Sequence, residues 1–531
     1  MNECFFDRFQ ITDGSGKSSF VGGVLVSGDR IVAIVPSEAK EQYAALKHRV
    51  DRVITALPGE CLTPGFIDAH AHSDAYLVIE PSAPSKITQG VTTEINGQCG
   101  GSVAPRYGEA RLSSDWASIL GERLTWHSLA EYREVLAAAK PALNTIQFIG
   151  HNTLRSSVMG YVGRRAQPED LTALGKMLEQ CLEEGAWGLT TGLIYQPGLF
   201  SSPDEVEYLA RLTAKHGGFY ATHMRSEGDR ILEAIDEVLE LVQKTGIKAE
   251  ISHLKTAGAR NWQKIDDVLE KVGGAVEKGL LLGSDRYPYC AAGTDLDVVF
   301  PDWAGEGAAK AECVRLADPP TRARIVEAIN TCGRDWSTVM IGGTWSAETR
   351  RYSGRYLSEI LENEGKGLSA GEMICRILAA DQCRTGAFFF GMSEENLAKI
   401  YSQPWIIPGS DASIRAPWAP LGNDYPHPRA YATMPEFYRR VRALGFSHEE
   451  TVARMTSIPA QRFEIPQRGE IKVGNFADLV VWSPESFKGQ STYSNPHVYT
   501  EGVRLVMVNG VSAYQDGAFT GNRGGRFLTR A

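Results

Sequence analysis

Apolar and polar positions alternate in short extended runs at both ends of the chain. Residues 21–35 contain two apolar runs around Ser-Gly-Asp, a pattern typical of a β-hairpin. Residues 54–72 continue as short extended pieces that Gly and Pro interrupt. The same strand-like pattern of apolar and polar residues returns after about residue 465, in GEIKVGNFADLVVWSP and VRLVMVNGVSAYQDGAF. We therefore predict one small β-sandwich domain built from both ends, with residues 1–61 as its first part and residues 465–531 as its second.

The middle of the chain alternates between strands and helices. Apolar runs such as 144–151 and 186–195 are separated by amphipathic segments of helical length such as 168–185. This alternation predicts parallel βαβ units, and region 62–464 is long enough for eight of them to close into a barrel. We interpret the irregular stretch from about 291 to 347 as an insertion. The predicted fold is α/β: a (β/α)8 TIM-like barrel with the β-sandwich beside it.

Composition narrows the class of protein. The 531 residues are 43% hydrophobic and 22% charged, as expected for a globular protein. The formal charge of −9 argues against nucleic-acid partners and against an anionic membrane surface. No apolar run reaches membrane-spanning length, the first residues do not resemble a signal peptide, and the nine cysteines are scattered. We therefore expect a cytoplasmic protein without nucleic-acid or membrane partners, and the sequence leaves its oligomeric state open.

Six residues with side chains that bind zinc lie where predicted strands end: His70, His72, Cys99, His223, His253 and Asp411. The two histidines of DAHAHSD are two positions apart, so on a strand they face the same side. A single buried histidine or cysteine is more often an ordinary core residue. In a parallel barrel, however, all strands end at one face, so six such residues in this order predict a metal site there. His151 also ends a predicted strand, and we interpret it as a group that supports a ligand.

The motifs around these residues resemble a known family. TPGFIDAHAHSD resembles the first-strand signature of the amidohydrolase superfamily. NGQCG, GHNTLR, TTGLIYQPG, THMRSE, SHLKTAG, DRYPY, GSD and PHPR follow in order, and over nearly the whole chain the sequence resembles the N-acyl-D-amino-acid deacylase (D-aminoacylase) branch. The resemblance implies a zinc-dependent hydrolase that cleaves N-acyl-D-amino acids, its small-molecule substrates, into a D-amino acid and a carboxylate. The D-selectivity rests on the resemblance alone.

The resemblance also implies a role for each matching residue. One tightly bound Zn²⁺ would be held by Cys99, His223 and His253, and a weaker second metal position by His70, His72 and Asp411. Asp411 would act as general base and then as general acid. The substrate-binding residues would be Tyr195, Lys255, Tyr287 and Arg429.

Two features of the sequence depart from the family pattern. The loop between Asp411 and Arg429 is longer than expected, which makes Arg415 a rival carboxylate binder. The insertion carries Trp303, Trp336 and Trp345, which could line a larger apolar pocket or simply pack in a core.

Two alternative functions stay open from the sequence. The first is another amidohydrolase activity on the same scaffold, namely hydrolysis of a cyclic amide, a carbamate or a lactone. The second is a non-catalytic amidohydrolase-like binding protein, which the presence of all six ligand types disfavours.

Overall fold

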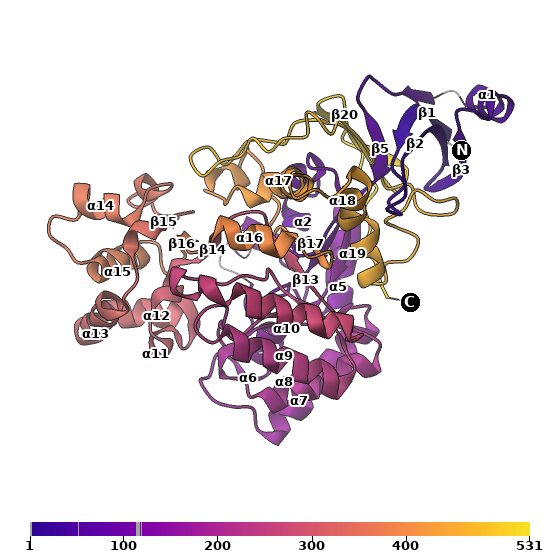
Figure 1. Cartoon of the computed structure of the whole chain (residues 1–531). Helices are drawn as coiled ribbons and strands as arrows, with labels where there is room; N and C mark the ends of the chain where they lie inside the picture. Colours follow the sequence, from indigo (N-terminus) through magenta and orange to yellow (C-terminus); the bar gives the residue numbers. More distant parts are fainter. Residues whose placement is uncertain (1–2, 51, 113–116, 118, 531) are drawn as a thin grey trace.

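A computed structural model describes residues 3–50, 52–112, 117 and 119–530 (Figure 1). Both ends of the chain contribute to one nine-stranded sheet. Its strands follow the order β21-β20-β19-β18-β5-β1-β2-β3, with β4 paired to β1. The N-terminal strands are β1 (Glu3–Ile11), β2 (Phe20–Ser27), β3 (Arg30–Pro36), β4 (Arg52–Thr55) and β5 (Cys61–Pro64). The C-terminal strands are β18 (Leu479–Trp482), β19 (Val503–Val508), β20 (Val511–Gln515) and β21 (Ala518–Phe519).

The junction between the two ends is the antiparallel pair β5 and β18, in which Leu62 lies opposite Val481. The hairpin predicted within residues 21–35 is present as β2 and β3, and Gly28 takes a positive φ of 62° in its turn. The pairing of the two chain ends thus agrees with the sequence prediction, while the division into a sandwich domain stays a prediction.

Parallel strands form the centre of the molecule. One three-stranded sheet contains β6 (Phe66–Asp68), β7 (Val91–Asn96) and β8 (Asn144–Gln147). A six-stranded sheet contains β9 (Ile149–Gly150), β10 (Gly188–Gly192), β11 (Phe219–His223), β12 (Lys248–Ile251), β13 (Leu282–Arg286) and β17 (Ile406–Pro408). Only Phe148 separates β8 from β9, and the Ala69 amide, next to β6, donates to the carbonyl of Pro408 in β17 at 3.1 Å. The α/β class predicted from the sequence is therefore confirmed.

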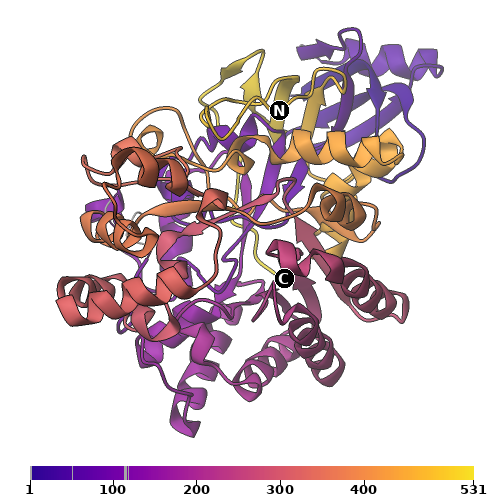
Figure 2. The same cartoon turned by 60° about the vertical axis from the view of Figure 1, so that its left-hand side comes forward.

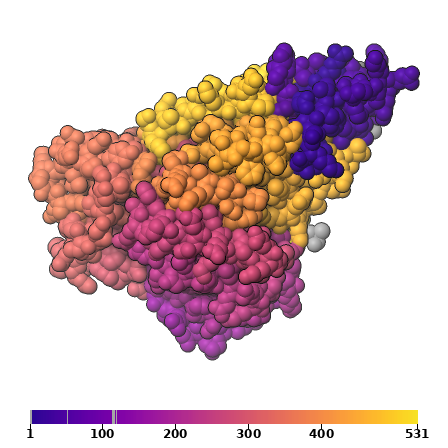
Figure 3. Space-filling view, in the orientation of Figure 1, coloured from indigo at the N-terminus to yellow at the C-terminus, as the bar shows by residue number. Residues whose placement is uncertain are grey.

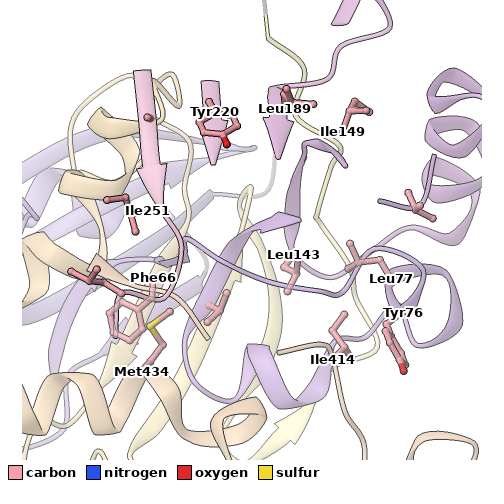
Figure 4. Packing of buried hydrophobic residues seen from close by; sticks show 14 of the residues in the cluster. Phe66, Tyr76, Leu77, Leu143, Ile149, Leu189, Tyr220, Ile251, Ile414 and Met434 are labelled. Carbon is pink, nitrogen blue, oxygen red and sulfur yellow. The ribbon is translucent and has the colours of Figure 1, made fainter. Parts of the chain in front are cut away.

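Helices follow most of these strands (Figure 2). They include α5 (Leu129–Ala139), α6 (His151–Met159), α7 (Pro168–Glu183), α8 (Pro203–Lys215), α9 (Ile231–Thr245), α10 (Ile265–Glu277), α16 (Glu394–Tyr401), α17 (Arg429–Ala443), α18 (His448–Met455) and α19 (Ser457–Arg462). Capping residues define where these helices begin and end. The Ser202 hydroxyl accepts a hydrogen bond from the Glu205 amide at the start of α8, and Gly246 ends α9 with a positive φ. Figure 4 shows Ile149, Leu189, Tyr220 and Ile251, from four successive strands, in one packed cluster. No helix in the described ranges is both long enough and apolar enough to cross a membrane.

Residues 291–390, here called the insertion lobe, form a separate unit beside the central strands (Figures 1 and 3). Its sheet has the order β14-β16-β15, from β14 (Ala291–Asp295), β15 (Val339–Ile341) and β16 (Gly386–Phe390). Its helices are α11 (Asp302–Gly305), α12 (Ala308–Ala317), α13 (Pro319–Thr331), α14 (Leu357–Glu364) and α15 (Ala370–Ala380). A hydrophobic core of its own runs from Leu296 to Ala387. These elements continue well beyond residue 347, where the sequence pattern placed the end of the insertion, because β16 must return to pair with β14.

The tryptophans of this lobe make packing contacts. The Arg324 guanidinium lies 4.5 Å from the centre of the exposed Trp303 ring, and that of Arg384 lies 4.8 Å from the centre of the Trp345 ring. Trp336 packs against the hydrophobic core of the lobe. The structure therefore favours the packing interpretation of these residues over an apolar substrate pocket.

Trp482 joins the terminal sheet to the centre, and its removal should be costly. The buried ring lies 4.7 Å from Phe487 and 5.0 Å from Tyr438 between centroids, and its Nε1 donates to the Thr63 hydroxyl at 3.1 Å. Trp482→Ala should lower the free energy of unfolding by about 3–5 kcal/mol, because it leaves a cavity and removes the hydrogen bond to Thr63. Urea unfolding followed by circular dichroism measures the loss. The exposed Trp303→Ala serves as control, and an equal loss in both variants would contradict this role of Trp482.

Candidate metal centre and active site

The structure places all six predicted ligands at the carboxyl ends of the parallel strands. They follow or end β6, β7, β11, β12 and β17. The Cys99 thiol lies 3.3 Å from Nε2 of His70 and 3.3 Å from Nε2 of His253. Nε2 of His72 lies 3.0 Å from Oδ1 of Asp411. The donor atoms of two groups lie within 4.8 Å of one another: His70, Cys99, His253 and Asp411 in the first, and His223, Glu227 and His253 in the second.

Three of these residues adopt backbone conformations that are rare outside glycine. The φ angles are 53° at Cys99, 38° at His253 and 51° at Asp411. Such angles cost about 1–3 kcal/mol each and persist where the surrounding structure enforces them. Here the Asp411 amide donates to the His70 carbonyl at 2.8 Å, which joins the two segments. Three of the six candidate ligands are therefore held in strained backbone conformations.

Two carboxylates, the buried Asp285 and the partly buried Glu227, orient the histidines, and the sequence analysis missed both. The Glu227 Oε1 atom lies 2.9 Å from Nδ1 of His253, and the Asp285 Oδ2 atom lies 3.2 Å from Nδ1 of His70. A histidine that donates Nδ1–H to a carboxylate leaves the Nε2 lone pair free for a metal. Asp285 also accepts the amide of His253 at 3.0 Å. Both acids lie inside motifs that carry the resemblance, THMRSE and DRYPY, so a search for acids at strand ends could have found them.

The charges of the site stabilise ionised groups despite burial. Burial opposes ionisation of Cys99, but His70 and His253 outweigh it and hold the pKa of the thiol well below its usual value. Burial likewise opposes ionisation of Asp411, yet Arg429 and His253 hold the pKa of this carboxyl well below its usual range. The pKa of His72 is raised to about 9, because contacts with Asp411 and Cys99 outweigh burial. The cluster therefore holds enough negative charge to compensate a bound cation.

The donor set fits zinc. Thiolate, imidazole and carboxylate are the three ligand types that Zn²⁺ takes in proteins. His223 is buried, and neither of its ring nitrogens has a hydrogen-bond partner within the described ranges, although Glu227 Oε2 lies 3.4 Å from Nε2. Buried polar atoms are normally paired, so a nitrogen left without a partner beside a thiolate is what a metal ligand would show.

A buried lysine, Lys86, binds the segments that lie beneath the candidate ligands. The Lys86 ammonium lies 2.7 Å from Oδ2 of Asp68 and 2.7 Å from Oε1 of Glu94. It also donates to the Ser410 hydroxyl at 2.8 Å and to the Ala412 carbonyl at 2.9 Å. Because Asp411 lies between these last two residues, Lys86 fixes the backbone on both sides of it.

The four residues expected to bind substrate surround this cluster. Tyr195 lies 4.9 Å from His223 between ring centroids, and the buried Tyr287 lies 6.4 Å from His253. Arg429 Nη1 donates to Oδ2 of Asp411 at 2.6 Å. The Lys255 ammonium bonds Glu227 and lies 2.8 Å from Nδ1 of His253, so its contacts in this structure are with groups that support the ligands.

Two other residues lie apart from the cluster. The rival Arg415 pairs with Asp424 at 3.2 Å and packs over the Tyr76 ring. His151 Nε2 lies 2.8 Å from Glu205, whose carboxylate also pairs with Arg155. His151 therefore supports this buried ion pair, contrary to the expectation that it orients a metal ligand.

Comparison with known proteins identifies the family. The model of the amidohydrolase family matches residues 54–291 and 395–514, which together make up most of the chain. This chain belongs to the amidohydrolase family. The two matched pieces are separated by residues 292–394, which correspond closely to the insertion lobe of this amidohydrolase.

Relatives that match nearly the whole chain show which branch of the family it resembles. The amidohydrolase is 32% identical to a D-aminoacylase of Alcaligenes xylosoxydans xylosoxydans over 98% of its own length and 96% of the relative. It resembles a solved D-aminoacylase, studied for a binuclear metal centre, with a TM-score of 0.82, 30% identity and 99% coverage of both chains. It also resembles the N-acyl-D-glutamate deacylase of Bordetella bronchiseptica, complexed with zinc and a phosphonate inhibitor, with a TM-score of 0.82, 29% identity and 99% coverage of both chains. The resemblance to the D-amino-acid deacylases is thereby confirmed.

Glu227 offers a test of the metal site that does not remove a predicted ligand. Glu227→Gln keeps the shape of the side chain but removes the charge that orients His253 and His223. We expect zinc affinity to fall about 10–100-fold, as is typical when an outer-shell carboxylate is lost. Competition with a chromogenic chelator measures the affinity. Glu237→Gln, which removes a carboxylate paired with Arg225, is the matched control, and equal affinities in both variants would refute the role of Glu227.

Proposed function

We propose that this amidohydrolase is a zinc-dependent hydrolase that cleaves N-acyl-D-amino acids into a D-amino acid and a carboxylate. The observation that carries the proposal is the convergence of Cys99, His223 and His253 at the carboxyl ends of the strands, beside Asp411. The near-complete coverage of relatives named D-aminoacylase supports the choice of substrate.

As the family resemblance implies, the six ligands would form two metal positions. Cys99, His223 and His253 would hold the tightly bound Zn²⁺, and His70, His72 and Asp411 would hold a weaker second metal. When bound, zinc supplies a Lewis acid that polarises the amide carbonyl and favours ionisation of water. Glu227 and Asp285 keep Nε2 of His253 and of His70 available, because each carboxylate lies beside the Nδ1 atom.

Asp411 is the proposed proton carrier. Arg429 holds Oδ2, while Oδ1 faces His72 at 3.0 Å and His70 at 3.4 Å. These contacts keep the carboxylate ionised and fixed in direction. It would accept a proton from the attacking water and later deliver a proton to the leaving amine nitrogen.

Arg429 and Tyr287 supply donors for the free carboxylate of the substrate. The Arg429 guanidinium lies 4.6 Å from the centre of the Tyr287 ring. The Tyr287 hydroxyl and the Arg429 Nε atom are both buried, and neither has a hydrogen-bond partner among the described residues. A substrate carboxylate placed between them would satisfy both donors. Tyr195 and Lys255 would complete the binding site, with Lys255 reaching substrate from its position beside His253.

We also propose how the chain is organised. The eight strand positions from β6 to β17 would close as a (β/α)8 barrel within residues 62–464, supported by the hydrogen bond from Ala69 to Pro408. Residues 1–61 and 465–531 would form the β-sandwich. All nine cysteines are free thiols, which supports a cytoplasmic location. The modest negative charge agrees with a small-molecule substrate and no nucleic-acid or membrane partner.

A substrate panel tests the proposal directly. N-acetyl-D- and N-acetyl-L-amino acids are incubated with the purified enzyme, and zinc is measured by mass spectrometry. We expect about one zinc per chain and hydrolysis of D-substrates only. Cyclic amides, carbamates and lactones are included in the panel. Hydrolysis of one of these, with none of the acyl amino acids, would overturn the proposed substrate but not the family.

Asp411→Asn tests the proposed proton carrier. The variant keeps the size of the side chain but cannot accept the proton, so turnover should fall about 10²–10⁴-fold. Zinc content should stay near one per chain, since Cys99, His223 and His253 are intact. Asp424→Asn removes a carboxylate that pairs with an arginine in the same loop and should retain activity. Near-wild-type turnover in Asp411→Asn would show that another group moves the proton.

A further inference from the structure

The strand β14 places Asp295 beside the proposed binding site for the substrate carboxylate. Arg429 Nη2 donates to the Gly293 carbonyl at 3.1 Å. A Cβ atom at Gly293 would lie 3.5 Å from the same Nη2, so this face of β14 points towards Arg429. Alternate residues of a strand share a face, and two residues span about 6.6 Å. The Asp295 side chain therefore lies on the same face of β14 as the contact with Arg429, and its Cα is about 6.6 Å along the strand from that of Gly293.

Two further acids lie next to the loop that carries Tyr195. A Cβ atom at Gly305 would lie 2.7 Å from Nε2 of Gln196 and 3.5 Å from Oε1 of Glu312. Gln196, the neighbour of Tyr195, also donates to the Asp302 carbonyl at 3.0 Å. Asp297 follows Asp295 by two residues and interacts with Glu312. The three carboxylates of Asp295, Asp297 and Glu312, here called the acidic wall, thus lie on the lobe between Tyr195 and Arg429.

The acidic wall has no cation of its own. In the part of the chain that the structure describes, no Lys, Arg or His forms a salt bridge with any of the three carboxylates. Glu312 is only 4% exposed, and its Oε2 has no hydrogen-bond partner in the same residues. The nearby Arg315 instead donates to the carbonyls of Ala304 and Glu306. Desolvation by the surrounding protein, together with the neighbouring Asp297, raises the pKa of Asp295 to about 7, and desolvation raises that of Glu312 to about 7 as well.

We infer that the acidic wall selects N-acyl-D-amino acids whose side chain ends in a cation, such as D-arginine, D-lysine or D-ornithine derivatives. The inference rests on the proposed function and names the substrate class of the same site. Nearly equal identities to a D-aminoacylase and to an N-acyl-D-glutamate deacylase do not distinguish side-chain classes. The acidic wall does, because a cation would pair with these carboxylates and favour their ionised forms, whereas a glutamate side chain would only add a fourth carboxyl group to them.

The test compares kcat/KM for three substrates: Nα-acetyl-D-arginine, N-acetyl-D-leucine and N-acetyl-D-glutamate. The wild-type enzyme should hydrolyse the arginine derivative about 100-fold more efficiently than the glutamate derivative. Asp295→Asn should lower kcat/KM for the arginine derivative about tenfold, raise that for the glutamate derivative, and leave that for the leucine derivative within about twofold. Asp302→Asn is the matched control, since it removes an exposed carboxylate of the same lobe outside the acidic wall, and it should change none of the three.

The outcomes separate the two levels of the proposal. If wild-type enzyme hydrolyses the leucine and glutamate derivatives as well as the arginine derivative, the inference is overturned while the proposed function stands. The inference is also overturned if the preference for arginine is unchanged in both Asp295→Asn and Asp297→Asn. Asp297→Asn is included in case Asp295→Asn does not fold. If zinc-loaded enzyme hydrolyses none of the three, the proposed function itself fails.

Discussion

The contact between the segments that follow β6 and β17 brings together residues about 340 positions apart, and the site depends on it. Three backbone hydrogen bonds join the segments: from Ala69 to Pro408 at 3.1 Å, from His72 to Ala412 at 3.3 Å and from Asp411 to His70 at 2.8 Å. The buried Lys86 ammonium reinforces them through Asp68 on one side and Ser410 on the other. An ammonium can be buried this completely only when carboxylates and carbonyls compensate its charge, so the position of Asp411 is set by a network that tolerates little displacement.

Charge balance is the second constraint on the site. Four acidic groups, Cys99, Asp411, Glu227 and Asp285, face a set of histidines within a few ångströms. Without a compensating cation such a cluster must retain protons, which is why the pKa of His223 is raised to about 9 by Glu227 and Cys99 despite burial. A divalent cation resolves the same imbalance while leaving the imidazoles neutral. The arrangement therefore favours metal binding through its charge as well as through its ligand types.

The insertion lobe adds chemistry that the central strands lack. It has its own hydrophobic core, and it lies outside the two segments that match the family model. It also reaches the site directly, since the Gly293 carbonyl accepts from Arg429 and Asp302 accepts from Gln196. In the proposed function, the central strands carry the groups for hydrolysis, and the lobe adds the carboxylates that we propose to select the substrate side chain.

The sequence by itself determined the features that depend on local order along the chain. Apolar periodicity located the strands and helices. Ligand-type residues at strand ends predicted that six side chains meet at one face: His70, His72, Cys99, His223, His253 and Asp411. Only the structure showed that the donor atoms of His70, Cys99, His253 and Asp411 form one group. Tertiary structure decided which side chains pair: Glu227 with His253, Asp285 with His70, Arg415 with Asp424, and His151 with Glu205. It also showed that the insertion lobe continues to Phe390, because β16 returns to pair with β14. Periodicity reports which face of an element is buried, but a pairing between distant residues depends on how those elements pack, and only the folded chain contains that information.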